Sequence, residues 1–143
     1  EAYTKKYHSS PLRKNSMACV ALPSCPLALA EAQRYLPEMI TKLEPLLQKY
    51  NLGDEEIVTR MTGCPNGCGR PYVAEIGMVG TGPGQYNLML GGDRYGERLN
   101  KLYKEKLNEG QILTEIDALL GQYVGNKLDS ETFGDFCNRT VLN

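Results

Sequence analysis

The sequence lacks three features: an apolar run long enough to cross a bilayer, an excess of charge of one sign, and more than one histidine. Without such a run there is no reason to expect a membrane protein. The 16 basic and 17 acidic side chains leave no strong field to attract nucleic acid or anionic lipid. His8 lies in a polar stretch, where solvent exposure explains it better than metal binding or proton transfer. We therefore expect small molecules and other proteins as partners, with no nucleic acid and no membrane.

The chain start, residues 1–6, has neither an initiator methionine nor the apolar stretch of a signal peptide. We expect a cytoplasmic protein and a C-terminal piece of a larger one. The 143 residues, 41% apolar and 23% charged, are typical of one globular domain. We therefore treat residues 1–143 as a single domain that begins with a polar lead-in over residues 1–16.

Two stretches have the spacing of amphipathic helices. Over residues 26–50, apolar side chains recur on one helical face. Pro37 and Pro45 interrupt this face, so we expect a short helix before Pro37 and another starting there. Residues 51–53, Asn-Leu-Gly, supply a stop signal. A further apolar face predicts a helix over residues 112–124.

The predicted strands lie between these helices. Residues 57–62 are β-prone and alternating, and they lead directly into Gly63 and Cys64. Residues 73–79 and 86–90 are two further β-prone runs, and the glycine-rich segment between them favours a hairpin loop. Strands and helices without a regular alternation predict an α+β fold, in which helices pack on a mixed sheet.

The cysteines need an explanation other than disulfides. Five is an odd number, so internal disulfides leave at least one thiol unpaired. Clustered thiols in a cytoplasmic protein more often indicate metal binding or catalysis. Cys19 and Cys25 form a Cys-x5-Cys pair, and Cys64 and Cys68 form a Cys-x3-Cys pair. Cys137 stands apart, and a small buried or half-exposed thiol explains it best.

Two local pairs of thiols suit one [4Fe–4S] cluster, because such a cluster needs one thiolate per iron. The glycine, proline and asparagine around Cys64 and Cys68 permit tight turns whose backbone N–H groups point at sulfur. Zinc pairs are usually closer in sequence than Cys19 and Cys25, which counts against zinc without excluding it. Spacing alone leaves three interpretations open: a cluster, a zinc site, or unliganded core thiols.

The segments around both pairs resemble one protein family. Residues 15–28 and 62–70 closely resemble the two cluster motifs of sulfite reductase hemoproteins, in the same order and separation. The resemblance continues through residues 74–80, 86–92 and 133–136, so it covers nearly the whole chain. The Cys-Pro-Asn-Gly-Cys loop is similar to that of nitrite and dissimilatory sulfite reductases as well. The first motif favours the assimilatory sulfite branch, and a siroheme nitrite reductase is the alternative.

The resemblance implies the fold of the nitrite and sulfite reductase 4Fe–4S domain. The four cluster ligands that it implies are Cys19, Cys25, Cys64 and Cys68. It further implies a siroheme whose iron shares the Cys68 sulfur with the cluster, with sulfite bound on the opposite face and reduced by six electrons to sulfide. Asn66 and Gly67, between two ligands, would set the shape of the loop and its hydrogen bonds to sulfur.

The resemblance also implies partners. Electrons would come from an NADPH-linked flavoprotein subunit, although ferredoxin-dependent enzymes share these motifs. The basic pocket for sulfite would belong to the N-terminal remainder of the hemoprotein. Arg13, Lys14 and Arg70 lie near the motifs, where solvation explains them better than contact with siroheme carboxylates. We expect the isolated chain to be inactive, and a structural domain with empty or zinc-filled cysteines is the alternative from another functional class.

Overall fold

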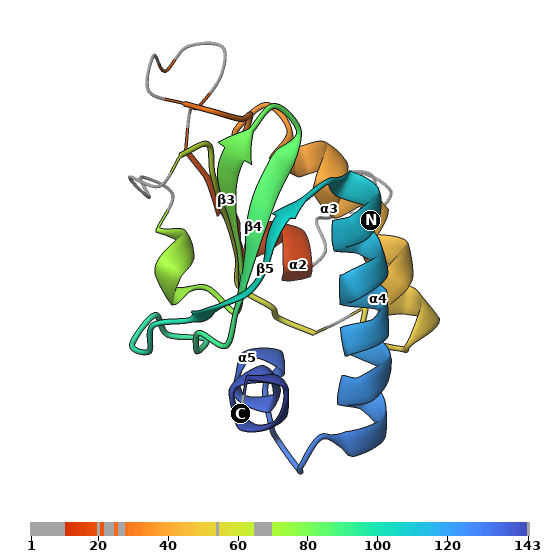
Figure 1. Ribbon diagram of the computed structural model, residues 1–143. Coiled ribbons are helices and arrows are strands. Elements are labelled where there is room, and N and C mark those ends of the chain that lie inside the picture. Colours follow the sequence, from red (N-terminus) through yellow and green to blue (C-terminus); the bar gives the residue numbers. More distant parts are fainter. Residues whose placement is uncertain are drawn as a thin grey trace.

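The computed structural model describes residues 11–19, 21, 25, 28–53, 55–64 and 70–142, the side chains of residues 13 and 14 excepted. Its elements are, in chain order, α2 (Pro11–Lys14), β1 (Ser16–Ala18), α3 (Leu36–Lys49), β2 (Thr59–Thr62), the 3₁₀ turn η1 (Pro71–Val73), β3 (Ile76–Gly82), β4 (Gln85–Leu90), β5 (Lys101–Leu107), α4 (Glu109–Asn126), α5 (Phe133–Phe136) and the π-helical turn η2 (Cys137–Val141). The strands form one sheet with helices packed on it (Figure 1). The predicted α+β class is confirmed.

The sheet is mixed, and its strands follow the order β1-β2-β3-β4-β5. β1, β2 and β3 run parallel to one another, whereas β4 and β5 are antiparallel to their neighbours. The predicted hairpin is confirmed, and Gly84 in its turn has a φ of 67° that favours glycine. β3 begins at Ile76 rather than at residue 73, because Pro71–Val73 form η1.

Helix α3 differs from the prediction at its start. Among the described residues 28–35, no short helix precedes α3: residues 29 and 30 form bends, Glu31 forms an isolated bridge with Ala21, and residues 33–35 form a turn. The reason is that the N–H groups of Leu29 and Ala30 donate to the carbonyl of Gly63, at 2.8 and 3.1 Å, and not to a helical turn of their own. Pro37 lies in the first turn of α3, where proline loses no hydrogen bond.

Pro45 does not interrupt α3, although the sequence suggested that it would. The buried side chains of Leu43 and Leu47 flank it and hold this face of the helix against the core. The predicted stop is confirmed, since α3 ends at Lys49 and Asn51 takes a left-handed conformation with a φ of 59°.

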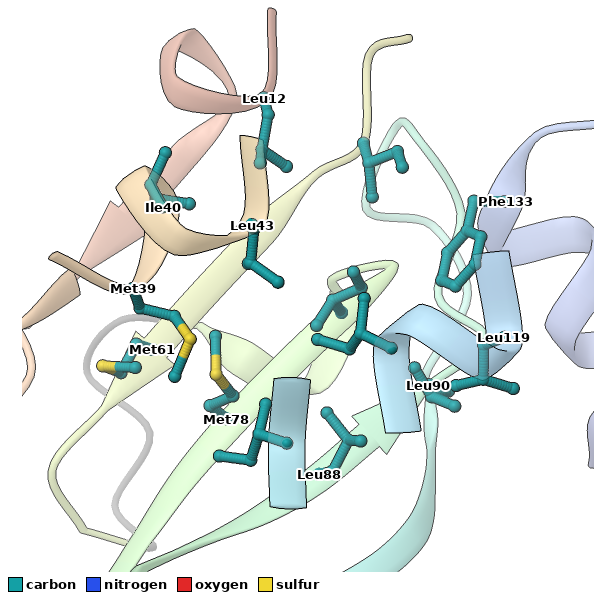
Figure 2. Packing of buried hydrophobic residues seen from close by; sticks show 14 of the residues in the cluster. Leu12, Met39, Ile40, Leu43, Met61, Met78, Leu88, Leu90, Leu119 and Phe133 are labelled. Carbon is teal, nitrogen blue, oxygen red and sulfur yellow. The ribbon is translucent and has the colours of Figure 1, made fainter. Parts of the chain in front are cut away.

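Helix α4 extends the predicted helix by three residues at its start and two at its end. A capping box fixes the start: the Gln111 N–H donates to Asn108 Oδ1, and the Asn108 N–H donates to Gln111 Oε1, each at 2.9 Å. Its buried face packs with α3 against one face of the sheet, and Figure 2 shows part of this core. The labelled residues are Leu12, Met39, Ile40, Leu43, Met61, Met78, Leu88, Leu90, Leu119 and Phe133. Among the described residues, no helix has the length and apolarity to cross a membrane.

Several elements escaped prediction. Residues 11–18, mostly within the expected polar lead-in, form α2 and β1, and the Leu12 side chain is only 1% exposed. β5 carries three lysines and a glutamate among seven residues, which hides the alternation of a strand. Lysines of this kind protect an edge strand from pairing with other chains.

The two ends of the sheet differ in what they carry. The "cysteine end" is where β1 and β2 finish, with Cys19, Cys25 and Cys64 nearby. The "Glu75 end" is where β3 begins, and α5 packs there, at the end opposite the β3–β4 hairpin (Figure 1). The candidate site is at the cysteine end.

Candidate functional site

Parallel pairing of β1 with β2 brings the two cysteine motifs together. Ala18 is the register partner of Met61, and the Cys19 N–H donates to the Met61 carbonyl at 3.2 Å. The carboxyl ends of parallel neighbours lie at the same sheet edge, where open α/β sheets commonly bind ligands. Cys19 directly follows β1, and Cys64 follows β2 by two residues. Strand topology alone therefore places one cysteine of each motif at the same edge.

Gly63 is the point where the segment carrying Cys25 meets the end of β2. Its carbonyl accepts the hydrogen bonds from Leu29 and Ala30 described above. A Cβ at this position would lie 2.5 Å from the Ala30 carbonyl oxygen and 2.6 Å from the Ala21 Cβ, so only glycine fits. The contact fixes both ends of the loop that contains Cys25 against β2.

Cys19 is the cysteine whose surroundings are best defined. Its Sγ accepts a hydrogen bond from Thr62 Oγ1 at 3.2 Å and another from the Gly63 N–H at 3.3 Å. The Thr62 side chain is fully buried. Two donors aimed at one sulfur favour negative charge on that sulfur, as around a metal-bound thiolate. The environment of Cys19 therefore fits a cluster ligand.

Cys25 and Cys64 are also free thiols in the structure. Cys64 is buried and Cys25 is half-buried. A turn holds Cys25: its N–H donates to the Ala21 carbonyl at 2.8 Å, and its carbonyl accepts from the Ala28 N–H at 3.2 Å. Three of the four predicted ligands thus belong to segments that meet around Gly63.

The other predicted site residues, Cys68, Asn66 and Gly67, lie outside the described residues, and their roles stay predictions. Within the described part of the chain, no three His, Cys, Asp or Glu side chains are grouped to hold one metal ion. A [4Fe–4S] cluster makes a different demand, because each thiolate binds a separate iron. The four-cysteine assignment is therefore a proposal, which we develop below.

Sequence reasoning overlooked the roles of Thr62 and Gly63 and the existence of β1. The signal for the first two was present in the Thr-Gly pair, in which Thr62 ends the predicted strand and Gly63 precedes Cys64. β1 is three residues long, too short for a periodic pattern. Without it, nothing in the sequence explained why the two motifs should meet.

Cys137 is separate from this site. It is fully buried, as predicted, in the C-terminal turns that pack at the Glu75 end. Burial raises the pKa of its thiol to about 12, and the charges of Glu75 and Glu131 add to this rise. A thiol so hard to ionise is a structural side chain rather than a metal ligand.

A cleft of about 440 Å³ lies beside the segment that joins the cysteine end to α3. The rings of Tyr35 and Tyr86 stack in it with centroids 6.1 Å apart. The Tyr35 hydroxyl donates to Glu109 and the Tyr86 hydroxyl donates to the carbonyl of Glu31. Burial raises the pKa of Tyr86 to about 12, with a smaller contribution from nearby Cys19. Both phenols are already paired within the chain, and we assign the cleft no role.

Comparisons with known proteins agree with the resemblance of the motifs. No family model matches the chain. The sulfite reductase [NADPH] hemoprotein beta-component of Leptospira biflexa is 58% identical over 137 residues, 96% of this chain and 25% of that protein. The proteins of the same name from Pectobacterium atrosepticum and Afipia carboxidovorans are 57% and 59% identical, over 93% and 91% of this chain. The chain spans about a quarter of the length of these relatives.

The fold is shared with a solved structure. The Mycobacterium tuberculosis NirA protein matches 97% of this chain with a TM-score of 0.74 and 26% identity, and the match covers 28% of that protein. Over 91–96% of its length, this chain is similar to about a quarter of each of these sulfite reductase [NADPH] hemoprotein beta-components.

Proposed function

We propose that the chain is the cluster-binding part of an assimilatory sulfite reductase. The proposed ligands of one [4Fe–4S] cluster are Cys19, Cys25, Cys64 and Cys68. Cys68 would also bridge to the iron of a siroheme. When bound, the two cofactors would supply electrons for the reduction of sulfite to sulfide. The names of the relatives and the order of the cysteine motifs support this assignment.

The single observation that carries the proposal is the environment of Cys19. Its sulfur accepts hydrogen bonds from Thr62, the last residue of β2, and from Gly63, which precedes Cys64. The second motif therefore supplies the donors that stabilise charge on a cysteine of the first. These hydrogen bonds between the motifs are expected if both motifs bind one anionic cluster. Independent core thiols have no need of them.

The residues of this chain would position the cluster and stabilise its charge. Thr62, which is itself fully buried, holds its hydroxyl on the Cys19 sulfur. Gly63 lets the Cys25 segment approach the end of β2 closely enough to share the site. Asn66 and Gly67 would shape the loop between Cys64 and Cys68. Charge on the cluster would thus be stabilised by fixed N–H and O–H dipoles.

The remaining partners are part of the same proposal. Sulfite would be the substrate, and the N-terminal remainder of a hemoprotein would supply the basic groups around it. An NADPH-linked flavoprotein would deliver electrons, as the names of the relatives suggest. The reaction would take place in the cytoplasm.

Metal and sulfide analysis of the chain tests the proposal. We expect anaerobically purified protein to contain about four irons and four acid-labile sulfides per chain. Replacing Cys19, Cys25, Cys64 or Cys68 by serine should reduce both, whereas the matched control Cys137→Ser should not. One zinc per chain without sulfide would contradict the cluster and favour a zinc-bound structural domain.

A hybrid protein tests the catalytic part. In it, this chain replaces the matching 137 residues of the Leptospira biflexa hemoprotein. We expect the hybrid to reduce sulfite and Cys68→Ser to abolish the magnetic coupling between cluster and siroheme. Unchanged coupling and turnover in Cys68→Ser would remove the bridge assignment. Competition between sulfite and nitrite separates the proposal from a siroheme nitrite reductase.

A further inference from the structure

Arg60 lies on the sheet face opposite α3 and α4, which we call the second face. Side chains alternate along a strand, and the next residue, Met61, points into the helix-covered core beside Met39 and Met78 (Figure 2). Arg60 is the register partner of Met17, and its Nη1 lies 2.9 Å from the Met17 sulfur. The two side chains therefore lie together on the second face.

The polar groups of Arg60 are poorly satisfied. Its Nε is buried without a hydrogen-bond partner, and the thioether of Met17 is a weak acceptor for Nη1. Burying part of a cation without an acceptor is unfavourable. Burial lowers the pKa of Arg60, and the positive charge of Arg70 lowers it further. The geometry agrees: Gly77 is the register partner of Arg60, and a Cβ on Gly77 would lie 2.4 Å from the Pro71 carbonyl oxygen, so the residue that follows Arg70 lies next to Arg60 on the second face.

Arg70 is held beside this position by the backbone. It has a left-handed conformation, with φ 54° and ψ 49°, directly before the turn η1. Asn100 Nδ2 fixes that turn by donating to the carbonyls of Pro71 and Ala74, at 2.6 and 3.0 Å. A left-handed arginine is energetically unfavourable and persists only where the surroundings impose it. The backbone of Arg70 is therefore fixed, and its exposed side chain extends from that position.

Other arginines of the chain have the acceptors that this pair lacks. Arg34, Arg98 and Arg139 form ion pairs with Glu31, Asp135 and Glu131. The Nε of Arg94 is also unpartnered, but Arg94 Nη2 donates to a carbonyl and its charge faces the Glu75 carboxyl. Within the described part of the chain, neither Arg60 nor Arg70 forms an ion pair. The pair has the charge to receive an oxyanion.

We propose that Arg60 and Arg70 form a binding site for a carboxylate, and that this carboxylate belongs to the siroheme. The second part rests on the proposed function. Met17 is 48% exposed beside Arg60, so the site combines an apolar surface with paired cations. A flat apolar ring with carboxylates at its rim matches this combination, whereas sulfite has no apolar part.

The position of the pair along the chain supports the same choice. Arg60 precedes and Arg70 follows the loop that carries Cys64 and Cys68. If Cys68 bridges to the siroheme iron, residues that flank its loop in the sequence would be near the ring. Sulfite would bind on the opposite face. Arg60 and Arg70 are therefore positioning residues for the cofactor and not part of the sulfite pocket.

Siroheme titration of the cofactor-free hybrid protein tests the proposal. The variants are Arg60→Met and Arg70→Gln, and the matched control is Arg34→Gln, whose ion pair lies elsewhere. The two ligands are siroheme and its methyl ester, which keeps the ring and loses the carboxylate charge. We expect each variant to bind siroheme roughly tenfold more weakly or worse, because a charge-assisted hydrogen bond is lost. Binding of the ester should not change between wild type and variants.

A stability measurement separates this role from a purely structural one. Arg60→Met removes an unsatisfied buried cation, so the metal-free chain should melt at the same temperature or higher. Weaker siroheme binding without loss of stability supports the site. Equal siroheme affinity in wild type and Arg60→Met would overturn it, as would weaker sulfite binding with siroheme binding intact. In either case the iron analysis and the Cys68→Ser result would still decide the proposed function independently.

Discussion

The two ends of the sheet satisfy their polar groups in different ways. At the Glu75 end the chain pairs them internally. The buried Glu75 carboxylate accepts from the Val58 and Gly134 N–H groups, at 3.0 and 2.8 Å, and Arg98 donates to backbone carbonyls and to Asp135. At the cysteine end the Cys19 sulfur accepts hydrogen bonds from Thr62 and Gly63, but on the adjoining second face neither Arg60 nor Arg70 forms an ion pair with any described residue. We infer that the Glu75 end maintains the fold and that the cysteine end is completed by ligands.

The largest expected effect is a loss of stability when the buried carboxylate at the Glu75 end is removed. Glu75→Ala removes the acceptor of two buried N–H groups, so the free energy of unfolding should fall by about 3–5 kcal/mol. Urea unfolding of the reduced, metal-free chain measures it. Glu105→Ala, on the exposed side of β5, is the matched control and should have little effect. A loss below about 1 kcal/mol for Glu75→Ala would mean that the carboxylate does not hold this end together.

The next largest effect concerns the junction at the cysteine end. Gly63→Ala forces a Cβ to within 2.5 Å of a backbone oxygen, so we expect a loss of about 2–3 kcal/mol. Iron content should also fall, because the Cys25 segment moves away from β2. The control is Gly125→Ala: nothing lies within 4 Å of the new Cβ, and α4 should gain up to about 1 kcal/mol. Normal iron content in a destabilised Gly63→Ala chain would show that the junction does not position Cys25.

Much of the fold could be predicted from the sequence, because its longer elements have a local signal such as an apolar helix face or a glycine-rich turn. The apolar face of α4 and the glycine-rich β3–β4 hairpin belong to this class. The missing short helix before Pro37 illustrates the limit. Local spacing favoured a helix, but the carbonyl of Gly63, distant in sequence, took the N–H groups of Leu29 and Ala30. Tertiary hydrogen bonds of this kind leave no local signal.

The candidate site was also only partly predictable from the sequence. The cysteines were identified from their motifs, but their meeting depends on β1, whose three residues carry no period. The Arg60 and Arg70 pair was not predicted as a unit, because it depends on which face of β2 is covered by helices. Strand register and the choice of face are properties of the assembled sheet. They become visible only in the structure.

A smaller effect is expected at Thr62, where the side chain should influence the bound cluster more than the stability of the fold. Thr62→Val removes the hydroxyl that donates to Cys19 but keeps the shape of the side chain. We expect stability to change by about 1 kcal/mol or less, since the bond to sulfur is weak. The reduction potential of the bound cluster should become more negative, because fewer hydrogen bonds reach its ligand sulfur. Redox titration followed by electron paramagnetic resonance measures this shift.

Thr114→Val is the control for this substitution. Thr114 donates to a helical carbonyl in α4 and contacts no cysteine, so its loss should leave the potential unchanged. An unaltered potential in Thr62→Val would remove the role assigned to that hydroxyl. A large loss of stability would instead show that the Thr62 hydroxyl supports the fold and does not serve the cofactor alone.

The smallest effect tests whether surface ion pairs contribute to the contrast. Lys42 donates to Glu109 at 2.6 Å, and together with the Tyr35 hydroxyl it lowers the pKa of that carboxyl below 4.5. A lowered pKa adds stability at pH values above 4.5, and this stability is lost as the pH falls through the folded-state value. Both side chains are partly exposed, and solvent screening should keep the effect of Lys42→Met at pH 7 below about 1 kcal/mol. The difference from wild type should shrink further in acid, whereas Lys101→Met, on the exposed edge of β5, should match wild type at both pH values. A Lys42→Met deficit that stayed constant into strong acid would show that packing of the lysine stem, and not its charge, supports the α3–α4 surface.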